Sequence, residues 1–248
     1  MERKLCRWAL PPPWLHGQVR LSNSPVLQGS IAAGMGPAAR RPRYGASSAA
    51  GFRENSRQVL IMLMMLRFIR VWLLSRLRRR IALDQSSRLP LRVWPDDLDL
   101  NFHMNNARYF SNADLGRLDW WVRTGLWQRA LARGWRPLAG DASARYSRSL
   151  QPFQRYELHT RLLGWNSKWF FAEHRFVARG GVYAVLVVRY LFLGRDGSRP
   201  RPEEVLALVG WQQGSPPLPR WVELWDEGQE RLSAELKREA TPGSAVLK

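Results

Sequence analysis

Three things are scarce in this chain: cysteine, acidic residues in the first third, and long apolar runs. Cys6 is the sole cysteine among 248 residues, which excludes an internal disulfide and a cysteine-based metal site. Such cysteine usage is typical of a reducing compartment, so we expect a cytoplasmic protein. Arg67 and Arg70 interrupt the apolar stretch over residues 59–74. It is therefore shorter than the ~20 apolar residues that a membrane-spanning helix needs.

The positive charge is unevenly distributed. The net charge is +19, and residues 1–80 hold 15 Arg and Lys against only two acids. The remaining residues are only mildly basic, so the extreme basicity belongs to the first third. A nucleic-acid binder driven by that region would show a steep salt dependence. No recognisable nucleic-acid-binding module occurs there, so we rank this class last.

Composition divides the chain into four parts. Residues 1–57 lack any sustained periodicity and predict a disordered extension or a mis-assigned translation start. Residues 58–85 predict a basic amphipathic segment, which either packs on the domain's own surface or lies peripherally on an anionic membrane. Residues 86–210 show regular patterning and predict the folded domain. Residues 211–248 predict a helical tail.

The patterning of the domain predicts an α+β fold. Apolar periodicity predicts a long helix over residues 107–126, a short second helix over 127–131, and C-terminal helices over 203–208 and 221–238. Alternating or continuous apolar runs predict strands over residues 88–94, 138–150, 156–164, 169–178 and 182–193. The last strand is almost entirely apolar, so it should be central and covered on both faces. This order indicates one long helix laid across an antiparallel sheet of about five strands.

Six polar side chains stand within ten positions just before the long helix: Asp97, Asp99, Asn101, His103, Asn105 and Asn106. As turn and capping residues they need no catalytic role, and Asn106, next to the helical pattern, is the expected cap. The same geometry also suits chemistry. A carboxylate activates water or attacks directly, and free N–H groups at a helix start stabilise an oxyanion. The spacing matches no zinc pattern, so no metal is required, and we expect no cofactor.

The run Asp97-Leu-Asp99-Leu-Asn-Phe-His103-Met-Asn105-Asn-Ala-Arg-Tyr109 resembles the motif of hotdog-fold acyl-CoA thioesterases of the 4-hydroxybenzoyl-CoA thioesterase type. The runs over residues 103–109 and 161–165 are similar to the branch that includes the thioesterase superfamily member six proteins. The resemblance covers about residues 86–210. It implies a hotdog fold, in which a long central helix is wrapped by the sheet, and hydrolysis of an acyl-CoA thioester.

The resemblance also implies roles for individual residues. Asp99 takes the place of the catalytic carboxylate, Asp97 holds the turn, and His103 and Asn105 shape the pocket. Phe102 stands where the family usually has glycine. The phenylalanine would narrow the pocket or move the oxyanion donor to a neighbouring N–H. The candidates for contact with the substrate are Asn106, Tyr109 and Phe102, together with three for the coenzyme A phosphates: Arg145, Arg148 and Lys168. Taken singly, each of the last three is more often an ordinary solvated surface charge than a phosphate ligand.

The resemblance implies a homodimer or a dimer of dimers with sites at the subunit interface. One alternative is a non-catalytic hotdog protein that binds acyl chains or lipids and uses residues 59–80 as a membrane anchor. A hotdog dehydratase is another enzymatic alternative, but it would need a paired Asp and His in a hydration motif that the sequence does not contain.

Overall fold

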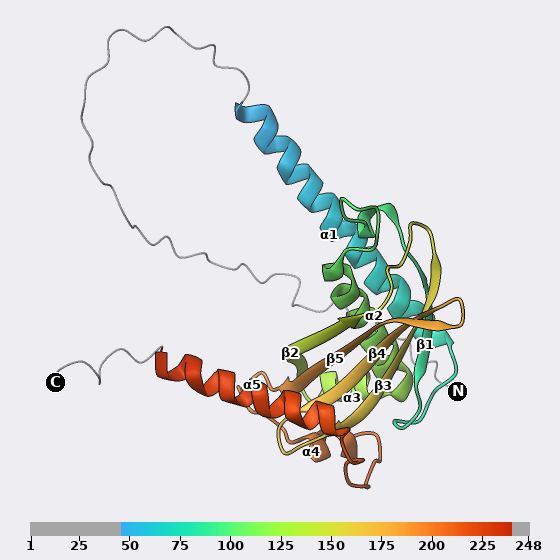
Figure 1. Ribbon diagram of the computed structural model, residues 1–248. Coiled ribbons are helices and arrows are strands. Elements are labelled where there is room, and N and C mark those ends of the chain that lie inside the picture. Colours follow the sequence, from blue (N-terminus) through green and yellow to red (C-terminus); the bar gives the residue numbers. More distant parts are fainter. Residues whose placement is uncertain (1–45, 240–248) are drawn as a thin grey trace, which may run out of the picture. The chain divides into compact units, whose positions relative to one another are not determined.

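The computed structural model describes residues 46–239 (Figure 1). In chain order the elements are α1 (Ala46–Leu77), β1 (Ser87–Arg92), η2 (Pro95–Asp97), α2 (Asn106–Thr124), α3 (Leu126–Ala132), β2 (Arg136–Tyr146), β3 (Arg155–Trp165), β4 (Phe170–Ala178), β5 (Gly181–Leu193), α4 (Pro202–Ala207) and α5 (Arg220–Glu239). The expectation for residues 1–45 lies outside the described residues. Residues 46–57, expected to lack regular structure, belong to α1 instead.

The five strands form one antiparallel sheet in the order β1-β3-β4-β5-β2. The strands β3, β4 and β5 follow one another as hairpins, whereas β1 and β2 occupy the two edges. Helix α2 contacts β1, β3, β4 and β5, so the sheet wraps around it (Figure 1). This arrangement confirms the predicted hotdog fold.

One glycine allows the close packing of α2 on β3, and another ends the helix. A methyl group on Gly116 would lie 2.4 Å from Thr160 Oγ1 and 2.8 Å from Leu158 Cδ2, so glycine lets the helix approach β3. Gly125 adopts a φ of 80° after the last helical residue, and its N–H donates to the Val122 carbonyl. A left-handed glycine of this kind ends helices, and it ends α2 where the sequence predicted.

Strand β5 is covered on both faces, as its apolar sequence predicted. Its inner face packs towards α2, and its outer face lies under α5 through the buried Val222. Arg189 is the charged residue of this buried strand. Its guanidinium pairs with Asp141 at 2.5 Å, Asp226 at 2.6 Å and Glu230 at 2.8 Å. Three carboxylates therefore offset the cost of burying the cation, and two of them, Asp226 and Glu230, fasten α5 to the sheet.

The C-terminal half of α1 packs on the domain. Phe68 and Val71 join the core cluster that also holds the start of α2. Ser75 Oγ donates to Asp119 Oδ1 at 2.6 Å, and Arg78 pairs with the same buried carboxylate. Of the two alternatives for residues 58–85, packing on the domain's own surface is therefore observed. Within residues 46–239, no helix is both long enough and apolar enough to cross a membrane.

Candidate functional site

Asp97, the first acid of the motif, is a buried anchor. It has no exposed surface, and its carboxylate accepts the Trp94 N–H at 2.9 Å. Arg67 of α1 donates to both of its oxygens, at 2.7 and 3.2 Å. The backbone carbonyl of Asp97 accepts the N–H of Asn105 at 2.8 Å. Asp97 therefore joins the end of β1, α1 and the start of α2, and no substrate reaches its carboxylate.

Asp99 lies in a different environment two residues further along. Its side chain is partly exposed. Oδ1 accepts the N–H groups of Asn101 at 2.8 Å and His103 at 3.3 Å, an arrangement that fixes an acidic side chain against its own turn. Oδ2 accepts no hydrogen bond from any residue that the structure describes. The turn thus orients the carboxylate and leaves one oxygen available.

The start of α2 provides a backbone donor. The capping residue is Asn105, one position before the expected Asn106, and its Oδ1 accepts the N–H of Ala107 at 2.9 Å. The Asn105 carbonyl accepts the N–H of Arg108 at 2.9 Å. The N–H of Asn106 meets no acceptor among the residues described. It remains open at the positive end of the helix dipole, where an anion is favoured.

A hollow of about 700 Å³ opens beside this loop, lined by Pro95, Leu98, Asp99, Leu100, Asn101, Phe102 and Asn105. Most of this lining is apolar, and Asp99 is its one charged residue. Phe102 has a φ of 56° and is 73% exposed. Only glycine adopts such a φ without strain, which explains why the resembling family favours glycine here. The neighbouring His103 imidazole makes no hydrogen bond to another described residue.

Tyr109 is buried and does not line the hollow. It is 2% exposed, and its hydroxyl accepts the Leu150 N–H at 3.3 Å. Its ring packs edge-on against Tyr146 and Phe176, with centroids 5.1 and 4.8 Å away. Tyr146 in turn donates to the Asn106 carbonyl at 3.3 Å. These contacts hold the start of α2 against the sheet and the segment after β2.

The three basic candidates lie in different places. Arg145 is exposed near the end of β2, and Arg148 places its guanidinium over the Tyr183 ring at 5.8 Å. Lys168 pairs with Glu230 of α5 at 3.4 Å. The end of β1 pairs with the start of β3, whereas Lys168 follows the end of β3, and eleven residues of strand span roughly 36 Å. Within one subunit the structure does not bring Lys168 to the hollow.

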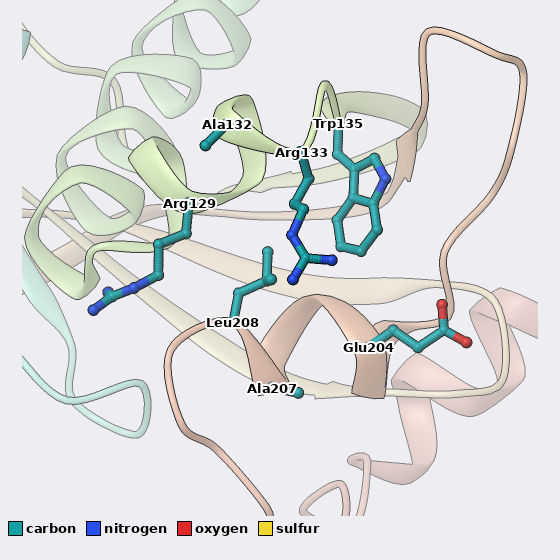
Figure 2. Close-up of a pocket in the computed structure, with 7 residues that line it drawn as sticks. All are labelled: Arg129, Ala132, Arg133, Trp135, Glu204, Ala207 and Leu208. Carbon is teal, nitrogen blue, oxygen red and sulfur yellow. The ribbon is translucent and has the colours of Figure 1, made fainter.

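A second hollow, of about 720 Å³, lies between α3 and α4 and is lined by Arg129, Ala132, Arg133, Trp135, Glu204, Ala207 and Leu208. Figure 2 shows Arg133 reaching towards α4, with Trp135 beside it. Glu204, its one carboxylate, pairs with Arg201 at 3.2 Å. The 19 residues of α2, roughly 28 Å at the usual rise, separate this hollow from the motif. The hollow between α3 and α4 is therefore separate from the hollow at the motif loop.

Arg67 is the residue that the sequence analysis missed. Arg70 of α1 is exposed. Arg67, however, pairs with Asp96 at 2.9 Å and Asp97 at 2.7 Å. Its spacing of four residues from Val71 places the two side chains on one helix face, but only the structure shows that this face is turned towards the domain.

A buried polar cluster lies between α2 and the sheet. His174 Nδ1 lies 3.0 Å from Thr160 Oγ1, and its Nε2 lies 3.5 Å from Arg117 Nη1. Burial, assisted by the charge of Arg117, lowers the pKa of His174 well below its ordinary value. Burial also lowers the pKa of Arg117 to about 10. None of these residues lines either hollow. Across the described residues, no group of three or more His, Cys, Asp or Glu is placed to hold a metal ion.

Comparison with known families decides the relationship. The family model described as the thioesterase-like superfamily matches residues 93–225, more than half of the chain. The chain belongs to the thioesterase-like superfamily. The matched residues of this superfamily member include the motif loop, α2 and all strands after β1.

Individual relatives are similar to this superfamily member over part of its length. Protein THEM6 of Xenopus laevis is 36% identical over 150 residues, which cover 58% of this chain and 70% of the relative. Thioesterase lcsJ of Purpureocillium lilacinum is 26% identical over 144 residues, covering 48% of this chain and 46% of the relative. The crystal structure of YbaW, a probable thioesterase from Escherichia coli, shares 18% identity at a TM-score of 0.46 and covers 49% of this chain and 97% of its own.

Proposed function

We propose that this protein hydrolyses acyl-CoA thioesters at the hollow beside the motif loop. The observation that carries the proposal is that two open groups belong to the motif loop and to the helix start that follows it. Asp99 offers a carboxylate oxygen with no hydrogen-bond donor among the described residues. The N–H of Asn106 opens the first turn of α2 without an acceptor there. A carboxylate and an open amide are the two groups that acyl transfer needs.

The reaction follows from these two groups. Asp99 acts as a base that takes a proton from water, or as a nucleophile that attacks the thioester carbonyl carbon itself. The oxyanion that forms on the carbonyl oxygen accepts the N–H of Asn106, a kind of donor worth ~10²–10³ in rate. The C–S bond then breaks and the thiolate of CoA leaves. In the nucleophilic route water hydrolyses the resulting anhydride, so both routes yield a carboxylic acid and free CoA.

The proposal includes assembly into a homodimer. Strand β2 is an edge strand of eleven residues. Its outer side pairs with no other described strand, and Leu138 on it is 53% exposed. A long unprotected edge of this kind favours pairing with another strand. Pairing with β2 of a second copy would satisfy that edge and bring the exposed Arg145 of each copy to the subunit interface.

A second candidate function is acyl-chain or lipid binding without turnover. Phe102 favours it, because its ring stands where the resembling enzymes have glycine and it is strongly exposed at the hollow. A ring in this position would narrow the hollow, whose apolar lining would then hold an acyl chain without turnover.

A thiol-release assay with the purified full chain distinguishes the two functions. Straight-chain acyl-CoAs of increasing length and an aromatic acyl-CoA are offered, and free CoA is measured together with ligand binding by calorimetry. Turnover of any member supports hydrolysis. Binding without turnover supports the second candidate. If no member of the panel is either bound or hydrolysed, both functions are contradicted.

A further inference from the structure

Helix α1 carries an apolar stripe on the side that faces away from the domain. The outward stripe consists of Met62, Leu66, Ile69, Leu73 and Leu77, and each of these side chains is at least 50% exposed. Successive members are separated by four, three, four and four residues, so they share one face of the helix. Monomeric proteins rarely expose a contiguous apolar patch without a partner for it.

The opposite face of α1 is held firmly against the domain. Arg67 donates to Asp97, Val71 is 5% exposed in the core, and Ser75 donates to the buried Asp119. These contacts fix the rotation of the helix about its own axis. The outward stripe therefore cannot turn inward, and its exposure is a built feature of the fold.

Charge identifies the occupant. Residues 62–80 contain six arginines and no acid, and Arg70, Arg76, Arg79 and Arg80 are exposed. A second copy of α1 laid on this face would bring like charges together, which opposes association. An anionic lipid surface attracts the same arginines and accepts the apolar side chains between its headgroups.

We propose that the outward stripe of α1 docks in the plane of an anionic lipid bilayer, with its arginines on lipid headgroups. The stripe runs over 16 residues, roughly 24 Å along the helix axis, and lies parallel to the surface because its other face is committed to the domain. Arg67 on that other face ties α1 to the motif loop, so docking holds the candidate site at a fixed height above the membrane. The proposal does not depend on thioester turnover.

Vesicle flotation with the full chain tests this proposal. The probes are phosphatidylcholine vesicles with and without phosphatidylserine. Wild type is expected to float with the anionic vesicles, and added salt should weaken its binding. The double variant Leu66→Gln/Leu73→Gln should lower the partition coefficient by about tenfold or more, since two half-buried leucines are lost. Arg70→Gln/Arg76→Gln should lower it by about thirtyfold on the anionic vesicles only.

The matched control is Leu232→Gln/Leu236→Gln on α5, because these leucines are exposed to a similar degree on a helix that also carries acids. It should float like wild type. All variants keep the basic residues of 1–45, so an effect of the α1 variants belongs to α1. Three results would overturn the proposal: no flotation of wild type, equal flotation of the α1 variants, or sedimentation showing that the stripe variants dissociate an oligomer of wild type.

Discussion

Replacing Arg67 with methionine should destabilise the protein more than replacing any exposed arginine of α1. Asp97 is fully buried, and Arg67 donates to it at 2.7 and 3.2 Å while also pairing with Asp96. Without Arg67, the Asp97 carboxylate keeps the Trp94 N–H at 2.9 Å and the more distant Arg108, whose Nε lies 3.9 Å away. A buried carboxylate would thus lose its principal partner.

The expected loss follows from those contacts. Removing one partner of a buried ion pair usually costs about 3–5 kcal/mol. The Arg67 side chain is one-fifth exposed and two weaker partners remain, so we expect a loss of about 2–3 kcal/mol. Urea denaturation followed by tryptophan fluorescence measures this free energy of unfolding.

Two further variants make the measurement specific. Arg70→Met removes an exposed arginine from the same helix and should change the free energy of unfolding by less than about 0.5 kcal/mol. Arg67→Met/Asp97→Asn removes both charges while the amide oxygen still accepts the Trp94 N–H, so it should recover most of the loss. If Arg67→Met proves no more harmful than Arg70→Met, the argument that α1 anchors the motif loop is wrong.

Three other perturbations test separate parts of the structure by the same denaturation assay. Gly116→Ala should lower the free energy of unfolding by about 1–2 kcal/mol, because the added methyl collides with Thr160 and a gain in helix propensity offsets only part of that strain; an unchanged value would contradict the close packing of α2. Phe102→Gly should raise the free energy of unfolding by up to about 1 kcal/mol, because glycine adopts the left-handed φ without strain and the exposed Phe102 ring packs little. A lower free energy of unfolding would contradict the strain at this position. Because the folded-state pKa of His174 is depressed, the unfolded chain takes up this proton first, and stability should fall as pH drops below 6.5 by at most about 1.4 kcal/mol per unit. His174→Gln should lose this component while His159→Gln retains it.

The elements of the domain were predictable because their apolar patterns are strong and local. The expected helix over 107–126 is observed as Asn106–Thr124, and Gly125 ends it as predicted. The continuous apolar run of β5 correctly indicated a central strand. Its one charged residue, Arg189, forms ion pairs with carboxylates. Such patterns need no knowledge of distant residues.

Long-range pairings were not predictable. Arg67 and Asp97 are 30 residues apart, and nothing local indicates that an arginine in an apolar run will meet a motif acid. The pairings of β1 with β3 and of β2 with β5 were not predicted, since only hairpin neighbours follow from sequence order. The cap was misplaced by one residue because Asn105 and Asn106 have equal capping propensity, and the close contact of the Asp97 carbonyl with the Asn105 N–H decides between them.

Turnover by the Asp99→Asn variant tests the proposed role of the Asp99 carboxylate most directly. The amide Oδ1 still accepts the N–H groups of Asn101 and His103, so the loop and the free energy of unfolding should be preserved and only the charge is lost. Asp84→Asn, an exposed acid in the turn before β1, is the matched control. On whichever acyl-CoA the wild type cleaves, Asp99→Asn should release CoA slower by about 10²–10⁴-fold while Asp84→Asn matches wild type. Release by Asp99→Asn at the wild-type rate would contradict the proposed mechanism.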